Sequence, residues 1–113
     1  MALQLKRAEQ ALRRRLQPLL AEHDITFEHW QVLAALQETP GLRMSDLAEA
    51  AVLPPGTLTR YVDRLVERAL LVRRIDAEDR RIVVIALSQS GETLVARIQA
   101  AEDRARPDVS VLP

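Results

Sequence analysis

The sequence contains no cysteine and very few aromatic residues. The absence of cysteine excludes disulfides, cysteine nucleophiles, thiol-based redox sensing and thiolate metal sites, and it fits a reducing compartment. Aromatic residues make up only 3% of the 113 residues, whereas hydrophobic residues make up 48%, so leucine, valine, isoleucine and alanine must build the core. A chain of this length is expected to form a single domain over residues 1–113.

The sequence also lacks the segments that mark membrane and secreted proteins. No apolar run reaches the roughly 18 residues of a membrane span, and the first residues lack the apolar core of a signal peptide. Charged residues make up 28% of the chain, which is typical of a soluble, ordered protein. We therefore expect a cytoplasmic protein without a membrane partner.

No arrangement of residues indicates catalysis. The sequence has no glycine-rich phosphate loop and no constellation of paired catalytic carboxylates. Ser88-Gln-Ser-Gly91 is not a nucleophile elbow and indicates helix capping instead. We therefore expect neither an enzyme nor a bound cofactor.

The charged residues are unevenly distributed although the formal net charge is zero. Residues 17–53 are acidic, whereas residues 1–16 and 54–81 are rich in arginine. Every positive side chain except Lys6 is arginine, which is suited to bidentate and minor-groove contacts. A bias towards arginine codons would explain the composition but not this placement.

The first half of the chain is expected to be helical. Hydrophobic periodicity predicts a helix over Ala2 to about Glu22, kinked or interrupted at Pro18. Thr26 is a plausible N-cap for a second helix, which the turn at 39–41 ends. Ser45 is the expected N-cap of a short third helix.

The second half predicts a helix, a hairpin and a last helix. The helix runs from about Pro55 to Arg68, and two β-branched runs at 71–75 and 81–87 suit antiparallel strands. Ser88 or Ser90 would cap a last helix that continues to about Arg104. The expected fold class is therefore mainly α with a small β-hairpin.

The helix at 55–68 is amphipathic, with Thr57 at the border between its faces. Its apolar side holds Leu58, Tyr61, Val62 and Leu65. Its polar side holds Gly56, Arg60, Asp63, Arg64 and Glu67. Two short helices, a tight turn and a helix with a row of arginines are typical of a helix-turn-helix.

The predicted hairpin behind this helix makes the pattern a winged helix. A wing that enters a narrow minor groove needs arginine at its tip, and Arg80 and Arg81 occupy the expected loop. An acid must hold the guanidinium in place, and Asp76 or Asp79 could do so. The alternative is that these arginines only keep a hairpin soluble.

Several motifs, in this order and spacing, resemble the winged-helix signature of the MarR family of bacterial transcription regulators over about residues 10–95. These motifs are Ile25-Thr-Phe-Glu-His-Trp-Gln-Val-Leu33, Met44-Ser-Asp-Leu-Ala48, Thr57-Leu-Thr-Arg-Tyr-Val-Asp-Arg-Leu65, Leu70-Leu-Val-Arg73, Asp76-Ala-Glu-Asp-Arg-Arg81 and Leu87-Ser.

The resemblance implies a dimeric regulator, with a recognition helix in the major groove and a wing in the minor groove of a palindromic operator. It places the helix contacts at Thr57, Thr59, Arg60 and Arg64, the wing contacts at Asp79, Arg80 and Arg81, and phosphate contacts at Arg43 and Ser45. It also implies a small aromatic effector between the DNA-binding lobe and the dimerisation helices.

The sequence departs from the family pattern at both ends of the winged helix. Ala69 stands where the family usually ends the recognition helix with glycine, so a left-handed backbone there would cost roughly 1 kcal/mol. The family's C-terminal part is longer, and only about one helix fits here before Pro107. We therefore expect either a truncated piece of a longer member or a C-terminally short member, with a homodimer that is weaker than in longer relatives.

Dimerisation helices are expected at 1–22 and 89–106, on either side of a winged helix-turn-helix core at 26–87. The apolar rows expected to form the dimer contact are Leu5, Leu12, Leu16 and Leu19 in the first helix, and Leu94, Val95 and Ile98 in the last.

Other sites have simpler explanations. His23 and His29 could bind a regulatory metal together with Asp24 and Glu28, but two histidines beside a helix start are ordinary, and we expect no metal. Trp30 could line an effector pocket or belong to the core.

The predicted function is a sequence-specific regulator that binds double-stranded DNA, with repression the commoner mode in the family. One alternative is a winged helix that binds proteins and not DNA, which the zero net charge would suit. Another is a ligand or metal sensor in which DNA binding is secondary.

Overall fold

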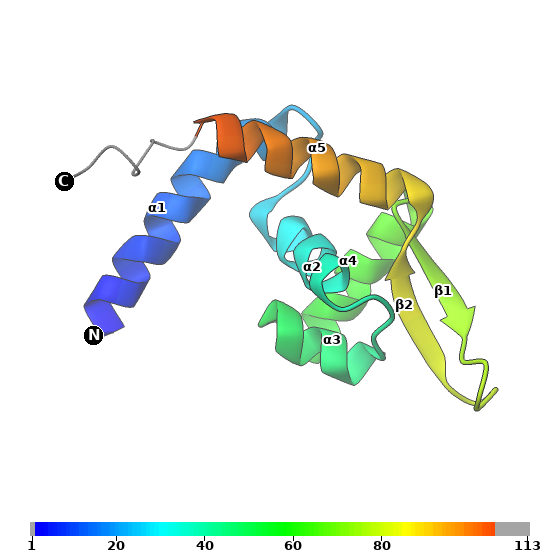
Figure 1. Cartoon of the computed structure of the whole chain (residues 1–113). Helices are drawn as coiled ribbons and strands as arrows, with labels where there is room; N and C mark the ends of the chain where they lie inside the picture. The colour runs from blue at the N-terminus through cyan, green and yellow to red at the C-terminus, as the bar shows by residue number, and fades with distance from the viewer. Residues whose placement is uncertain (1, 106–113) are drawn as a thin grey trace.

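The computed structural model describes residues 2–105 and confirms a mainly α fold with one hairpin. Residue 106 of the expected last helix and Pro107 lie outside the described residues. Within the described part, no helix has the length and apolarity needed to cross a membrane. The elements, in chain order, are α1 (Ala2–Ala21), α2 (Phe27–Glu38), α3 (Met44–Ala51), α4 (Pro55–Glu67), β1 (Leu71–Ile75), β2 (Val83–Leu87) and α5 (Gln89–Ala105) (Figure 1).

The start of α2 confirms the predicted cap. The Oγ1 atom of Thr26 accepts a hydrogen bond from the backbone N–H of His29 at 3.1 Å. The Thr26 N–H donates to Nδ1 of His29 at 3.5 Å, which completes a capping box. The chain turns after α2 at Gly41, whose φ of 81° suits glycine.

The prediction that Ser45 caps α3 is wrong. The helix begins at Met44, with Arg43 as an N-cap that contributes no side-chain hydrogen bond. The cause is Leu42, whose N–H donates to the carbonyl of Ile85 at 3.0 Å and whose carbonyl accepts from the Ile85 N–H at 2.7 Å. Because this bridge holds Leu42 extended beside β2, the helix can begin two residues later.

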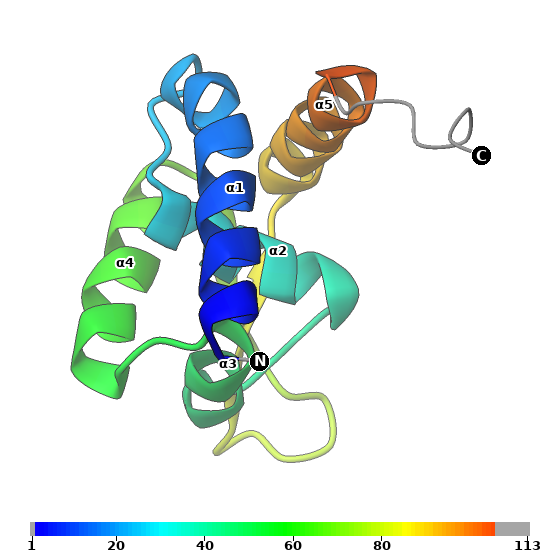
Figure 2. The same cartoon turned by 90° about the vertical axis from the view of Figure 1, so that its left-hand side faces the viewer.

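Pro18 does not interrupt the first helix, which runs through it to Ala21. The C-terminal turns of α1 pack with α2 and α5 above the winged helix, whereas the N-terminal half of α1 projects away from the other helices (Figure 1). Figure 2 shows the C-terminal ends of α1 and α5 at the top of the molecule and α3 with the hairpin loop at the bottom.

The expected apolar rows are only partly exposed. Leu16, Val95 and Ile98 are 3%, 0% and 1% exposed, because they fill the chain's own core. The expected pairing face on α5 is therefore wrong for Val95 and Ile98, which pack within this chain. The large apolar residues left exposed on α1 are Leu3, Leu5 and Leu12.

The hairpin pairs Leu71 with Leu87 at its base and Ile75 with Val83 at its end. The second strand therefore begins at Val83 and not at residue 81, since Arg81 and Ile82 still belong to the loop. The loop is closed by a hydrogen bond from the Asp76 N–H to the Ile82 carbonyl at 2.9 Å.

Three non-glycine residues of the described chain end helices in the left-handed conformation, and the first is Asp24, at φ 55° after α1. Ala69, at φ 60°, follows α4, so the alanine costs roughly 1 kcal/mol relative to glycine. Val52, at φ 57°, ends α3 in the same way, and its side chain is exposed. Nothing in the sequence marks the left-handed conformation of Val52, because a β-branched residue is disfavoured at positive φ.

Candidate nucleic-acid interface

The two faces of α4 are separated as predicted. Leu58, Val62 and Leu65 are fully buried, and Tyr61 is half-buried. The opposite face is exposed and carries Arg60. The buried leucines and valine therefore fix the rotation of α4, and that rotation leaves its polar face free for a ligand.

The remaining predicted helix contacts lie on or beside this exposed face. Arg64 and Thr59 are exposed, and Thr57 is half-buried at the border. The Thr59 hydroxyl donates to the carbonyl of Pro55 at 3.0 Å, which leaves its oxygen free to accept a hydrogen bond. The N-cap residue Pro54 contributes no side-chain hydrogen bond to the first turn.

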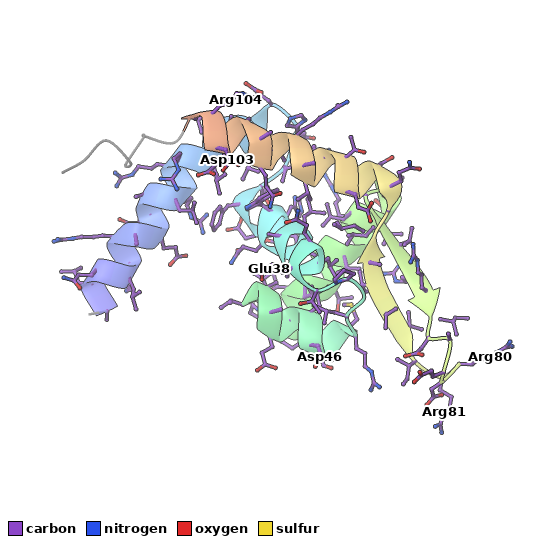
Figure 3. All side chains as sticks on the ribbon, in the orientation of Figure 1. Glu38, Asp46, Arg80, Arg81, Asp103 and Arg104 are labelled. Atoms are coloured by element: carbon purple, nitrogen blue, oxygen red, sulfur yellow. The ribbon has the colours of Figure 1, made fainter. Side chains whose placement is uncertain are left out.

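The wing carries one fixed arginine and one free arginine. Arg81 donates from Nε to Oδ1 of Asp79 at 3.1 Å and from Nη2 to Oδ2 at 3.0 Å, so the pair is bidentate. Arg80 is exposed, and no side chain among residues 2–105 is paired with it. Figure 3 shows both arginines at the tip of the hairpin, pointing away from the body of the protein.

The acids of the wing hold its shape. Hydrogen bonds from the side chain and backbone of Arg81 hold the pKa of Asp79 below its ordinary value, and Asp79 in turn raises the pKa of Arg81. Oδ1 of Asp76 accepts from the N–H of Glu78 at 2.7 Å. Asp79 therefore orients the guanidinium, and Asp76 folds the loop backbone, which separates the two roles that the sequence left open.

An ion pair that sequence reasoning missed connects the hairpin to α4. Arg73 on β1 donates from its guanidinium to Oδ1 of Asp63. One of the two acids on the polar face of α4 is therefore paired within the chain. A pair between a helix and the following strand has no sequence signal, because it depends on how the two elements pack.

The predicted phosphate contacts lie at the start of α3, at the same end of the molecule as the wing tip. Arg43 and Ser45 are both exposed. The charge of Arg43 contributes to the lowered pKa of Asp79, so it acts on the wing through space. Asp46, in the first turn of α3, lies on the same lower edge of the molecule as Arg80 and Arg81 in Figure 3.

The other end of α4 is attached to the α1–α2 loop. Arg68 donates from its guanidinium to the carbonyls of Asp24 at 2.6 Å and His23 at 2.9 Å. This contact was also missed, since backbone acceptors leave no mark in a sequence. It connects the C-terminal end of α4 to the helix that precedes the winged helix-turn-helix.

The histidine pair does not assemble a metal site. Within residues 2–105 no group of three or more histidine, aspartate or glutamate side chains is placed to hold a metal ion. His29 instead packs against Tyr61 of α4 in a T-shaped contact, with ring centroids 4.9 Å apart and planes at 88°.

A cavity of about 310 Å³ lies between α1, α2 and α5. Trp30, which is 9% exposed, belongs to the core and also lines this cavity. Arg15 donates from Nε to Oε1 of the buried Glu102 at 2.9 Å beside it. The lining residues are Leu12, Leu16, Trp30, Gln99, Glu102 and Asp103.

Comparison with known proteins gives one consistent result. A family model described as "MarR family" matches residues 23–82. The "HTH-type transcriptional regulator FarR" of Neisseria gonorrhoeae is 33% identical over 94 residues, which are 83% of this chain and 64% of that protein. The chain therefore spans slightly less than two thirds of the length of this relative.

Solved structures share the fold. NadR in complex with 4-hydroxyphenylacetate has a TM-score of 0.84 and 31% identity, over 90% of this chain and 72% of that one. The S. aureus MepR F27L mutant, bound to an oligodeoxyribonucleotide, has a TM-score of 0.75 and 26% identity, over 91% of this chain and 76% of that one.

Proposed function

Because this chain belongs to the MarR family, we propose that it is a transcriptional regulator that binds double-stranded DNA with sequence preference, as a homodimer on a palindromic operator. Repression is the proposed mode, since it is the commoner one in the family. The protein would act in the cytoplasm and would have no catalytic activity.

One observation carries the proposal. The exposed face of α4 and the tip of the wing both present arginine, and on the wing one arginine is fixed by a bidentate contact with Asp79. An exposed helix suits the major groove, and a fixed arginine on a narrow hairpin suits the minor groove. The fold shared with a MepR variant bound to an oligodeoxyribonucleotide supports the same arrangement.

Roles for individual residues follow from their positions. Arg60 and Arg64 would contact base edges, with Thr57 and Thr59 beside them on α4. The phosphate contacts would come from Arg43 and Ser45 at the start of α3, and the wing contacts from Asp79, Arg80 and Arg81.

A gel-shift experiment with the promoter region of the protein's own operon tests the function. We expect a shifted complex that unlabelled promoter DNA removes and that an equal amount of unrelated DNA does not. If no DNA is bound at any low-salt condition, the proposed function fails, and the alternative of a winged helix that binds proteins is favoured instead.

Removal of the wing arginines should weaken binding on every DNA sequence. Arg80→Ala combined with Arg81→Ala removes the side chains that would recognise groove shape and phosphate, and it leaves α4 unchanged. We expect the slope of log affinity against log salt to fall by about one unit for each phosphate that the variant no longer neutralises. An unchanged slope in a salt titration of the double variant would show that the wing does not face DNA.

The dimer is proposed to form through α1, with the segments at 1–22 and 89–106 as its dimerisation helices. Leu3 and Leu5 are 61% and 71% exposed in the projecting half of α1, so they are available to a second copy. Leu5→Glu should shift the protein towards monomer in sedimentation equilibrium at micromolar concentration. Ile75→Glu, at a site 66% exposed on the wing, is the matched control and should leave the assembly unchanged.

A clean wild-type monomer that binds a palindrome with one-to-one stoichiometry would contradict the dimer. Two-fold pairing is what allows one recognition helix and one wing to occupy each half-site, one helical turn apart.

A small aromatic effector is a second proposed partner, and the cavity beside Trp30 favours it. The cavity lies between the dimerisation helices and the winged helix-turn-helix, and NadR, which shares the fold, was solved with 4-hydroxyphenylacetate. Trp30 is the only tryptophan of the chain, so its fluorescence reports on this cavity alone. A saturable change in emission on titration with 4-hydroxyphenylacetate or a salicylate-like phenol would support a site, and unchanged emission and calorimetric heat would count against one.

A further inference from the structure

A second groove lies beside α4, away from the cavity that Trp30 lines. It has a volume of about 350 Å³ and is lined by His29, Arg60, Tyr61 and Arg64. The two arginines are exposed, whereas the histidine and tyrosine are half-buried and form the more enclosed wall. No acid lines this groove, although the acids of the described chain are otherwise numerous around α2.

The ring of His29 is held in place from two sides. Its Nδ1 atom accepts the capping hydrogen bond from the Thr26 N–H at 3.5 Å, and its ring stands at 88° to that of Tyr61. Because Nδ1 is an acceptor, the neutral imidazole carries its proton on Nε2. Among the described residues no hydrogen bond occupies Nε2, so that atom is a donor without a protein partner.

All four side chains of the groove can donate hydrogen bonds. The two guanidinium groups make the surroundings of the groove positive, and the imidazole and phenol can donate directly to an anion with acceptor oxygens, such as a phosphate diester. A helix in the major groove is flanked by a phosphate backbone on each side. On the hairpin side of α4 the space is taken by Arg73 and its ion pair with Asp63, so the groove beside His29 lies on the opposite flank.

We propose that this groove holds a backbone phosphate of the bound DNA and that His29 is a phosphate contact, with Tyr61 beside it. The inference rests on the proposed DNA binding and extends it to a residue of α2. Arg60 and Arg64 lie on the exposed rim, where they can reach base edges while the enclosed wall contacts the backbone.

The charged groups around His29 give the contact a pH dependence. Burial lowers the pKa of His29 in the free protein, and the positive charges of Arg68 and Arg64 lower it further, against the opposing effect of Glu28 and Asp24. Protonation places the second proton on Nδ1 and ends the capping bond from the Thr26 N–H in the free protein and in the complex alike, whereas only the complex has a phosphate beside the ring. The phosphate favours the protonated form, so the pKa of His29 is higher in the complex than in the free protein. The affinity for DNA therefore rises as the pH falls through the pKa of the complex, and it levels off below the pKa of the free protein.

The test measures the affinity for the operator and for a scrambled copy at pH 6 and pH 8, in wild type and five variants. At pH 6, His29→Ala should weaken binding to both DNAs by roughly five- to tenfold, with an unchanged ratio between them, and should lower the salt slope by about one unit. His29→Gln keeps a neutral donor and should lose less affinity but most of the pH dependence. Tyr61→Phe keeps the ring contact and should produce a smaller loss.

The second histidine of the chain is the matched control. His23→Ala leaves the groove intact and should keep the full pH dependence. The fifth variant, Thr26→Ala, removes the capping hydroxyl but not the imidazole, and thermal unfolding of each variant verifies that it is folded.

Three results would overturn the phosphate contact. The first is wild-type affinity and pH dependence in both His29 variants, and the second is a loss of affinity confined to the operator. The third is an equal loss of affinity in Thr26→Ala, since His29 would then act only through the cap. If wild type binds no DNA, the proposed function itself fails. If wild type binds and the His29 variants match it, only this inference fails.

Discussion

Alanine at Arg60 or at Arg64 is expected to reduce the preference for the operator over scrambled DNA by about 1–3 kcal/mol, or roughly 5- to 150-fold. The two residues lie one turn apart on the exposed face of α4, and the three fully buried residues of the opposite face prevent the helix from rotating. A bidentate arginine discriminates between bases because the wrong base leaves its donors unpaired. The loss should therefore concentrate at one or two positions of each half-site.

Arg97→Ala is the matched control for these variants. Arg97 is an exposed arginine on α5, outside the interface proposed for α4 and the wing. The Arg97→Ala substitution removes the same charge, and it should leave the ratio between the affinities for operator and scrambled DNA unchanged. Arg60 and Arg64 variants that both keep the wild-type ratio would show that α4 does not read bases.

Gly91→Ala is expected to lower the free energy of unfolding by about 3 kcal/mol, in the upper part of the range for overpacked sites. A Cβ atom at this position would lie 2.1 Å from the carbonyl oxygen of Leu70. That oxygen cannot easily move, because it accepts a hydrogen bond from the Ser88 N–H at 3.0 Å, which joins β2 and α5 to the end of α4. The melting temperature should fall by on the order of 10–20 °C.

The same substitution at Gly56 is the control and should have the opposite sign. Gly56 lies in the first turn of α4, and an added Cβ atom would meet nothing within 4 Å. Alanine there should raise the free energy of unfolding by up to about 1 kcal/mol, because it restricts the unfolded chain. Equal melting temperatures for the two variants would contradict the close approach of α5 to the Leu70 carbonyl.

Features set by neighbouring residues could be predicted from the sequence. The faces of α4 follow from a period of 3.6 residues, and Thr26 caps α2 through a residue three positions away. Asp79 and Arg81 are two positions apart in one loop, so their contact was also within reach of local reasoning.

Features that depend on packing between distant segments could not be predicted. The start of α3 depends on a bridge between Leu42 and Ile85, and that bridge displaced the expected cap at Ser45. The apolar face of α5 was correctly identified, but periodicity does not say what covers it, and Val95 faces this chain's own core. The carbonyls that hold Arg68 belong to a loop 44 and 45 residues away, and no residue type marks such acceptors.

The central claim is that α4 and the wing bind DNA with sequence preference, and one measurement tests it most directly. Bound sites would be selected from random DNA, and the affinity for the selected palindrome would be compared with that for its scrambled copy at physiological salt. We expect a ratio of roughly a thousandfold or more, as specific DNA-binding proteins show. A ratio near one, with no common site among the selected sequences, would contradict the claim.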